Sequence, residues 1–308
     1  MAEKRIDAAT GTGTVGHEWD GIEELDTPMP RWWLYILYGT IVIAIVYSVL
    51  YPAWPGLTGA TKGTLGWSSH GALAKEVAAE QARKGPILAA IARTPVDQIA
   101  QHPDLLRAAE EGGRSAFKVH CIQCHGAGAA GSKGYPNLND DDWLWGGDPA
   151  TILQTVTHGV RQPGDDATRF SQMPAFGRDG ILTAPQIGQL VSYVRYVSHQ
   201  EPMNGSARAG EALFAANCAV CHGADAAGNR QVGAPNLTDA IWLYGGDRDA
   251  LTQTITNARY GIMPAWTGTL DPVTIKMLTT YVHSLGGGEK APQPVAVAQQ
   301  AAADVQSK

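Results

Sequence analysis

Two short motifs in the sequence place two cysteines and one histidine at a spacing that suits a metalloporphyrin. Their residues are Cys121, Cys124 and His125 in the first motif, and Cys218, Cys221 and His222 in the second. The pattern C-x-x-C-H is typical of covalent attachment of c-type haem. Two thiols one helical turn apart can each add to a vinyl group on one porphyrin edge, and the next histidine then lies under the iron. The motifs use all four cysteines of the chain, so the sequence predicts two haem c groups with histidine as the proximal ligand.

The cysteine pairs also fit two other kinds of site. Cysteines separated by two residues can bind tetrahedral zinc, and the cysteines of a secreted protein can form disulfides. A zinc site would leave the histidine after each second cysteine unexplained, and a disulfide framework would not need one. The doubled motif in matching surroundings favours haem over both alternatives.

Two methionines are placed to supply the sixth ligand of each iron. Met173 and Met263 each begin a Met-Pro-Ala-aromatic segment downstream of a haem motif, where the proline stiffens the turn. A thioether ligand raises the reduction potential relative to bis-histidine ligation and leaves no open position for oxygen or peroxide. We therefore predict axial methionine ligands and a role in electron transfer. His158 could replace Met173 as a ligand, but its counterpart in the second copy is Asn257, which favours a surface role for this histidine.

The haem motifs lie in two copies of one internal repeat. A Gly-x-x-x-Phe pattern precedes each motif, at Gly113 and Gly210, and each repeat closes on a helical pattern that carries a tyrosine, Tyr193 or Tyr281. We expect each glycine to let its helix cross closely over the final helix of its own repeat. The repeats thus predict two small helical domains in tandem. The first is 104–200, the second is 205–286, and a hinge near 201–205 joins them.

A Trp-Leu-x-Gly-Gly-Asp segment follows each haem motif and contributes Trp143 and Trp242. An indole N–H can donate a hydrogen bond to a haem propionate, whereas simple core packing explains the same residues equally well. The first repeat is longer than the second before its Met-Pro-Ala segment, and we expect this insertion, 158–170, to shape a contact with a partner subunit. An acidic run, Asp140 to Asp142 with Asp148, has no cation nearby in the sequence. It is either a solvated face or a surface that steers a basic donor cytochrome.

A stretch without charged residues, from Trp32 to Tyr51, predicts a membrane anchor. As a helix it spans about 30 Å, the thickness of the hydrocarbon core of a bilayer. Tryptophan and tyrosine gather at both ends, as in the aromatic belts of membrane helices. Basic residues before the span outnumber those after it, which predicts a cytoplasmic N-terminus and periplasmic haem domains. The span lacks the short apolar core and cleavage site of a secretory signal peptide, so we expect a retained single-pass anchor.

The rest of the chain is divided by composition. Residues 1–30 form a polar cytoplasmic segment, 31–54 the anchor, 55–103 a periplasmic connector with a helix broken at Gly85-Pro86, and 287–308 a disordered tail. The mildly acidic balance, with a formal net charge of −6 and 17% charged residues, gives no indication of nucleic-acid binding. The predicted fold class is all-α.

Both haem repeats resemble the class I cytochrome c fold. The opening segment, residues 16–25 followed by Pro28-x-Pro30-Arg31-Trp32-Trp33, is similar to the N-terminus of the di-haem subunit III of cbb3-type cytochrome c oxidases. The resemblance runs from about residue 16 to residue 285, with the opener, anchor, connector and haem domains in the order of that subunit. It implies a non-catalytic electron-transfer subunit in the bacterial inner membrane, within an oxidase that reduces oxygen and pumps protons. The implied partners are a catalytic haem-copper subunit, a mono-haem cytochrome c subunit and a donor cytochrome c.

Two other functions remain open at the level of sequence. An anchored di-haem carrier could serve a different respiratory complex, and the haem domains alone do not exclude it. A di-haem peroxidase would need one iron with a vacant or displaceable sixth position, and two intact methionine segments argue against it.

Overall fold

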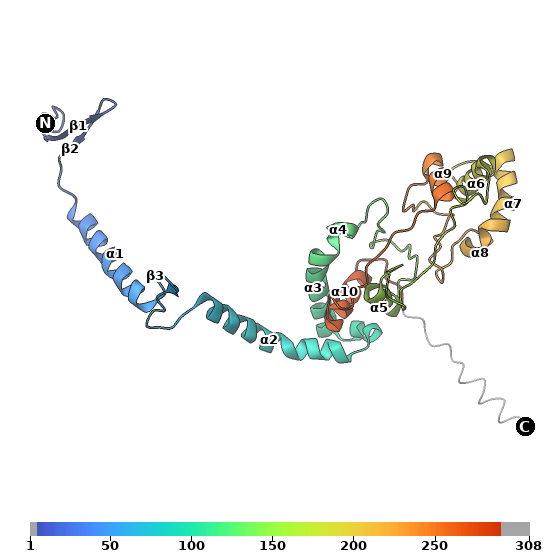
Figure 1. Cartoon of the computed structure of the whole chain (residues 1–308), viewed down its shortest axis with the longest axis horizontal. Helices are drawn as coiled ribbons and strands as arrows, with labels where there is room; N and C mark the ends of the chain where they lie inside the picture. The colour runs from blue at the N-terminus through green and yellow to red at the C-terminus, as the bar shows by residue number, and fades with distance from the viewer. Residues whose placement is uncertain (1–4, 291–308) are drawn as a thin grey trace, which may run out of the picture. The chain divides into compact units, whose positions relative to one another are not determined.

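The computed structural model describes residues 5–290 of the chain, which divides into two compact units at Met1–Arg83 and Lys84–Lys308. Helices dominate, and the strands found within residues 5–290 are short and lie in the first unit (Figure 1). The predicted helical fold class, with one N-terminal apolar helix, is confirmed.

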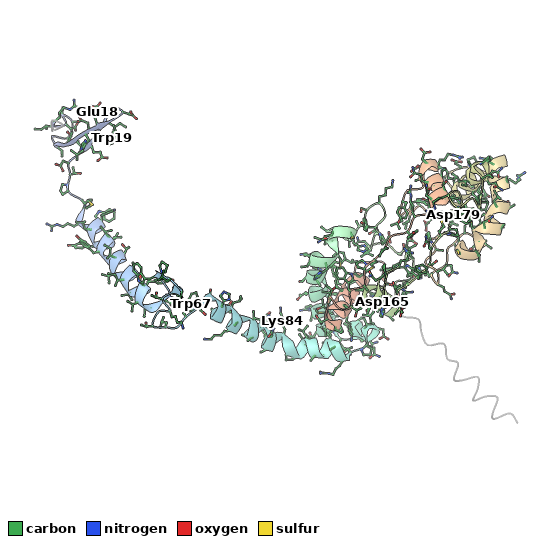
Figure 2. The ribbon with its side chains drawn as sticks, viewed as in Figure 1. Glu18, Trp19, Trp67, Lys84, Asp165 and Asp179 are labelled. Atoms are coloured by element: carbon green, nitrogen blue, oxygen red, sulfur yellow. The ribbon has the colours of Figure 1, made fainter. Side chains whose placement is uncertain are left out.

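The first unit carries the apolar helix α1 (Arg31–Leu50) between two small hairpins. This helix is long and apolar enough to cross a membrane, with a mean hydropathy of 2.1, and none of its residues is buried. The sequence did not predict the hairpin of β1 (Thr14–Trp19) and β2 (Ile22–Leu25), which carries the labelled Trp19 in Figure 2. Asp20 and Gly21 both have positive φ at its turn, as expected of Asp-Gly in a two-residue hairpin loop. The second hairpin is β3 (Pro55–Gly56) with β4 (Gly59–Ala60).

The connector helix α2 (Ser69–Arg93) ends before Thr94-Pro95, as predicted. The predicted break at Gly85-Pro86 is wrong, because the helix continues through Pro86. Downstream of this proline, Ile91 is fully buried against Ile99 and Ala109, so tertiary packing offsets the backbone hydrogen bond that proline removes. Lys276 also donates to three carbonyls at the C-terminus of α2, at 2.7–3.0 Å, where a cation complements the helix dipole.

The second unit consists of short helices whose beginnings are set by capping residues. Asp148, Thr183, Asn204, Asp247 and Asp271 stand at the N-caps of α5, α6, α7, α9 and α10. The side-chain oxygens of the three aspartates and of Asn204 accept from the first free amides of their helices. At Thr183 the side chain of Gln186 accepts from the amide and the hydroxyl of the cap residue. The elements of this unit after α2 are η1 (Val96–Gln101), α3 (Pro103–His120), α4 (Ile122–His125), α5 (Pro149–His158), α6 (Ala184–Val197), α7 (Gly205–Asn217), α8 (Ala219–His222), α9 (Arg248–Asn257) and α10 (Pro272–His283).

The two repeats exchange their final helices. Helix α10 of the second repeat packs on α3 of the first, and α6 of the first repeat packs on α7 of the second (Figure 1). The prediction that each repeat closes on its own final helix is therefore wrong. The glycines allow close helix crossings, as expected, but each crossing is with the final helix of the other repeat. A Cβ on Gly113 would lie 2.1 Å from the carbonyl oxygen of Met277, and one on Gly210 would lie 2.1 Å from that of Gln189.

Each of the two packed cores therefore draws on both repeats. The first haem module comprises α3, α4, α5, the loop from Met263 and α10, and its core includes Phe117, Ile152 and Leu278. The second haem module comprises the loop from Met173 with α6, α7, α8 and α9, and its core includes Phe176, Leu190 and Phe214. The predicted bounds 104–200 and 205–286 describe the sequence repeats, whereas the second module is the continuous segment 173–257, inserted into the first.

The predicted hinge near residues 201–205 is instead a fixed loop inside the second module. Glu201 accepts hydrogen bonds from Arg195 on α6 at 2.5 Å and from Arg248 on α9 at 2.9 Å. Asn204 caps α7 through the amide of Ala207. Because this loop joins two helices that pack on each other, it lies within one hydrophobic core and does not form a hinge between two domains.

The first residues of the predicted disordered tail are packed on the first haem module. The carbonyl of Gly287 accepts from the indole of Trp143 at 2.6 Å, and Glu289 accepts from the amide of Gly147 and pairs with Arg230. The prediction of disorder is therefore wrong for residues 287–290. The remainder of that prediction, residues 291–308, lies outside the described residues.

Candidate haem sites

Each C-x-x-C-H motif forms one tight helical turn directly after a longer helix. Cys121 ends α3 and begins α4, and its carbonyl accepts from the amides of Cys124 and His125 at 3.2 and 2.9 Å. Cys218 does the same between α7 and α8, at 3.1 and 2.9 Å. The two turns share one backbone geometry, so the two cysteines and the histidine are presented in the same way in both modules.

The motif histidines are oriented for metal binding by a backbone carbonyl. Nδ1 of His125 lies 3.0 Å from the oxygen of Pro136, and Nδ1 of His222 lies 3.1 Å from that of Pro235. Burial lowers the pKa of both imidazoles, with the carbonyl contact opposing it, so each ring is neutral at pH 7. A neutral ring that donates from Nδ1 keeps its Nε2 lone pair for a metal, which is the usual arrangement of a metal-binding histidine.

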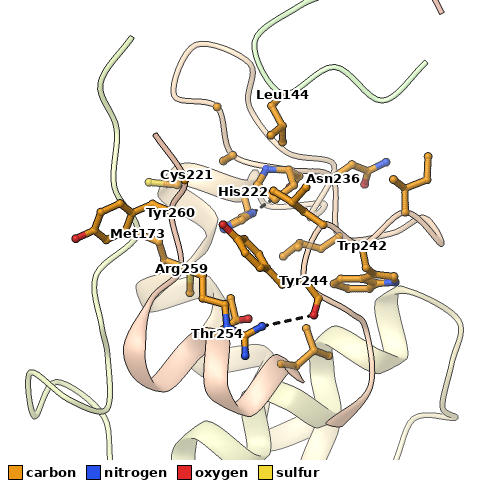
Figure 3. Close-up of a pocket in the computed structure, with 18 of the residues that line it drawn as sticks. Leu144, Met173, Cys221, His222, Asn236, Trp242, Tyr244, Thr254, Arg259 and Tyr260 are labelled. Atoms are coloured by element: carbon orange, nitrogen blue, oxygen red, sulfur yellow. Dashed lines mark hydrogen bonds between the residues drawn. The ribbon is translucent and has the colours of Figure 1, made fainter. Parts of the chain in front are cut away.

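A cavity of about 640 Å³ lies beside the second motif, within the range of ligand sites in proteins. Cys218, Cys221 and His222 line it together with Met173 and Trp242 (Figure 3). Its other walls include apolar side chains of the second core, such as Phe214 and Leu251. A flat apolar ring with thiols at one edge and imidazole below it fits this donor set and lining, so the residues present suit haem c.

Two arginines, Arg161 and Arg259, line this cavity and would offer positive charge to the propionates of a bound haem. Arg161 is half-buried and donates to the carbonyls of Gly261 and Ser171 at 2.8 and 2.9 Å, and its burial lowers its pKa. Arg259 lies over the ring of Tyr244, 5.4 Å from its centroid, and donates to the carbonyl of the same residue (Figure 3). These partners are neutral, so each guanidinium keeps a charge that a carboxylate of the cofactor would compensate.

The two methionines lie on the modules that the helix exchange assigns to them. Met173 packs against the core of the second module, and Met263 packs against the core of the first module, which Cys121 also contacts. Each predicted axial ligand is thus brought together with the haem motif of the other repeat.

The tryptophans take different positions. The indole N–H of Trp143 donates to Gly287, so this donor is engaged by the backbone, and the ring packs on the first core. The packing interpretation therefore describes Trp143 better than the predicted propionate contact. Trp242 packs on the second core and also lines the cavity, so its propionate contact remains a prediction.

The remaining polar residues singled out in the sequence are accounted for locally. His158, at the end of α5, pairs with Asp165 at 3.1 Å, which agrees with a surface role. Asp148 is the N-cap of α5. Burial raises the pKa of Asp142 to about 6, with Asp239 and Asp140 adding to the effect and Arg230 opposing it. The acidic run therefore does have a cation beside it, contributed by the second repeat.

The alternatives to haem gain no support from the structure. Within residues 5–290, no group of three or more histidine, cysteine or acidic residues is clustered as a metal site. None of the four cysteines, all of which lie within residues 5–290, is joined to another in a disulfide. Burial raises the pKa of Cys121 and of Cys218 to about 11, with the second thiol of each motif contributing less.

Helical modules and doubled C-x-x-C-H turns together define a c-type cytochrome with two haem motifs, and its N-terminal apolar helix is long enough to cross a membrane. Comparison with known families agrees with this class. The chain matches the cbb3-type cytochrome c oxidase subunit III model at residues 108–194 and 205–282, and the N-terminal domain of cytochrome oxidase-cbb3, FixP, at residues 11–58.

Full-length relatives give the same assignment. A cbb3-type cytochrome c oxidase subunit CcoP of Cereibacter sphaeroides is 52% identical over 276 residues, which cover 90% of this chain and 95% of that protein. A subunit FixP of Sinorhizobium medicae is 51% identical, with 93% and 98% covered, and a subunit CcoP of Azospirillum brasilense is 49% identical, with 94% and 100% covered. The chain belongs to the family of cbb3-type cytochrome c oxidase subunit III. Covalently bound haem c follows from this membership, and the two matched segments agree with two haems.

The sequence predicted the candidate donor residues but not how the chain connects them. The signal that could have revealed the exchange is loop length. The segment that leaves α5 for Met173 is long, whereas the segment from α6 to α7 is short and starts and ends on packed helices. The sequence also placed Arg161 only in the insertion 158–170 and did not assign it to the cavity of the second motif, because nothing in its sequence neighbourhood indicates such a position.

Proposed function

We propose that this chain is the membrane-anchored di-haem electron-transfer subunit of a cbb3-type haem-copper oxidase. It accepts electrons from a donor cytochrome c and passes them toward the oxygen-reducing, proton-pumping catalytic subunit. Its further partner is the mono-haem cytochrome c subunit of the same complex. Support comes from family membership and from the related CcoP and FixP subunits, to which the chain is similar over nearly their whole length.

The observation that carries the proposal is the geometry of the two motif histidines. Both imidazoles are held by a proline carbonyl with Nε2 free, and both modules bring a methionine to the core that holds the haem motif. His125 and His222 are the proximal ligands, and Met173 and Met263 supply the sixth ligands. Haem iron with both axial positions filled supplies one-electron redox chemistry without an open site for substrate. The protein fixes the spacing, orientation and potential of the cofactors.

The proposed location follows from the anchor. With Arg31 at the start of α1 and few basic residues after it, the positive-inside bias puts the N-terminus in the cytoplasm and both haem modules in the periplasm. The exposed apolar surface of α1 agrees with insertion in the bacterial inner membrane.

Purification of the complex from membranes tests the function. We expect the chain to copurify with a haem-copper catalytic subunit and a mono-haem cytochrome c, to carry two haem c by pyridine haemochrome, and to be reduced rapidly by a ferrous donor cytochrome c. Copurification with a different respiratory complex would support the anchored-carrier function. A high-spin ferric haem with rapid peroxide turnover would support the peroxidase.

A further inference from the structure

The hairpin of β1 and β2, which precedes the membrane helix, carries an apolar face that stays exposed in the structure. We propose that this face docks on lysine- and arginine-bearing cytoplasmic loops of a multi-span membrane protein, which in the proposed complex is the catalytic subunit. The inference rests on the proposed function and location, which place the hairpin in the cytoplasm beside the oxidase. It goes beyond them, because it names a contact between subunits that electron transfer does not require.

The two faces of the hairpin carry different kinds of residues. Glu18 lies opposite Glu23 in the strand pairing, and Trp19 lies opposite Ile22; Glu18 and Trp19 are labelled in Figure 2. Residues directly opposite each other point to the same face, whereas neighbours along one strand point to opposite faces. The two glutamates therefore share one face, and the tryptophan and the isoleucine share the other.

The glutamate face is stabilised from within the chain. The guanidinium of Arg5 pairs with Glu18 at 3.4 Å and also with Glu23, which offsets the repulsion between two like charges placed directly opposite each other. The backbone holds Arg5 in place, since its carbonyl accepts from the amide of Thr14 at 2.7 Å and its amide donates to the hydroxyl of Thr14 at 3.2 Å. The charged face thus has its partners in this hairpin.

The apolar face remains open to solvent in the part of the chain that the structure describes. Trp19 is 72% exposed and Ile22 is 70% exposed. A two-stranded hairpin is at best marginally stable in water, and it gains stability when an apolar face packs on another element. Tryptophan is also a residue type that is enriched at the energetic centres of protein interfaces. This face is therefore suited to contact a partner outside residues 5–290.

The charge around the apolar face indicates which kind of partner fits. Residues 14–26 include five acidic residues and no lysine or arginine, and Arg5 compensates one of these charges. The cytoplasmic leaflet of a membrane is negative, so it repels this segment, and a second copy of the hairpin does so as well. Cytoplasmic loops of membrane proteins carry an excess of lysine and arginine. Such loops are therefore the surface whose charge complements the hairpin.

The short linker to the membrane helix restricts where the hairpin can dock. Residues 26–30 separate the end of β2 from Arg31, the first residue of α1. A linker of this length spans at most about 20 Å, and Pro28 and Pro30 reduce its flexibility. The hairpin is therefore held near the membrane surface, where the loops between neighbouring membrane helices lie. In the proposed location the haem modules are on the other side of the membrane and cannot cover this face.

Site-specific crosslinking in intact membranes tests the contact. A photoreactive benzoylphenylalanine replaces Trp19 in the full-length chain, and the same probe in place of Trp54, which is 65% exposed beyond the other end of α1, is the matched control. After illumination, the complex is purified and the crosslinked peptides are identified by mass spectrometry. We expect the probe at position 19 to crosslink to a lysine- or arginine-bearing cytoplasmic loop of the catalytic subunit, and the probe at position 54 not to reach that loop.

Crosslinks from position 19 to lipid, to a second copy of the chain or to any other protein would overturn the docking surface, as would no crosslink at all. If the chain still copurifies with the oxidase in these cases, the proposed function stays intact. A di-haem chain that purifies without the oxidase subunits would overturn the proposed function and the docking surface together. A crosslink from position 19 to a periplasmic domain would overturn the proposed orientation as well.

A second measurement follows the release of the chain from the immobilised catalytic subunit in detergent. Trp19→Ala with Ile22→Ala should accelerate dissociation at least about tenfold, because loss of a central anchor acts mainly on the dissociation rate. Glu24 follows Ile22 by two residues and lies on the same face, so Glu24→Lys should accelerate dissociation as well, by a factor that falls as salt rises. Trp54→Ala with Leu57→Ala, a pair that is also exposed, is the control and should leave the rate unchanged. Equal rates for the two double variants would overturn the proposal.

Discussion

The two haem modules make the same contacts, but the chain runs through them differently. The second module is one continuous segment, 173–257, which begins with its methionine and ends with α9. The first module is assembled from two distant parts, α3 to α5 and the segment from Met263 to α10. The difference shows that the same packing contacts can form whether the helices follow one another in the chain or come from distant segments, as long as the same helix faces meet.

Deletion of residues 258–308 should have the largest effect and separates the two modules most clearly. It removes Met263 and α10, so the first module loses a helix that carries three of its core residues, Ile275, Leu278 and Val282. We expect the first haem to lose the sulfur-to-iron charge-transfer band of methionine ligation and the second to keep it, measured on truncated chains in which alanine replaces both cysteines of the other motif. If the repeats were independent domains, the second haem would be the one affected.

Substitution of one buried phenylalanine in each module tests the helix packing and should have a somewhat smaller effect than the deletion. Phe117 and Phe214 are each 1% exposed, so truncation to alanine should cost about 3–5 kcal/mol of unfolding free energy. The crosswise packing predicts where the loss appears. Amide hydrogen exchange should accelerate on α10 for Phe117→Ala and on α6 for Phe214→Ala. Acceleration on the final helix of the same repeat would contradict the exchange.

Substitution of the glycines at the helix crossings should cause the next largest loss of stability. A methyl group at Gly113 or Gly210 has no room against the facing backbone, so Gly113→Ala and Gly210→Ala should each cost about 1–3 kcal/mol. Chemical unfolding followed through each haem measures the cost. Gly188→Ala is the matched control on α6, because a Cβ there meets nothing within 4 Å, and alanine is the better helix former by roughly 0.5–1 kcal/mol. An equal loss at Gly188 would show that the crossings are not close.

The smallest expected change in stability comes from Asp142, an acidic residue that lies near Asp239 of the other repeat. Burial raises the pKa of Asp142 to about 6 from its ordinary value of 3.8, with Asp239 adding to the rise. A carboxyl group with a raised pKa costs stability above that pKa and stops costing it as the pH falls below the ordinary value. Discounted for partial exposure, Asp142→Asn should stabilise the protein by about 1 kcal/mol at pH 8 and by almost nothing below about pH 4. Denaturant unfolding at several pH values measures this, and a loss of stability at pH 8 would contradict it.

The haem motifs, the methionine segments and the apolar helix could be predicted because each depends on a local pattern. A C-x-x-C-H turn forms wherever a helix ends on those residues, and its chemistry requires no knowledge of distant contacts. The capping residues of α5 and α9, Asp148 and Asp247, likewise act within one helical turn.

The exchange could not be predicted from the same patterns, because the repeats present equivalent surfaces. Gly113 can accept Tyr193 or Tyr281, and Gly210 can accept either as well, so residue types do not distinguish the partners. The choice lies in the connections: the loop between α6 and α7, fixed by Glu201, keeps these two helices together and leaves α10 for α3. The packing of Gly287 on Trp143 also escaped prediction, because a Gly-rich segment without periodicity gives no indication of its contacts.

The insertion of one module within the other sets the order in which the chain can be completed as it leaves the ribosome. The methionine, cysteines and histidine of the second haem site have all been synthesised once α9 has been made, while the first motif still waits for Met263 and α10. Cys121 and Cys124 are therefore synthesised before the other cysteine pair, but the helices that pack around them are completed later. Enzymes that attach haem to this polypeptide would meet Cys121 and Cys124 in an open precursor for longer than the pair that follows them.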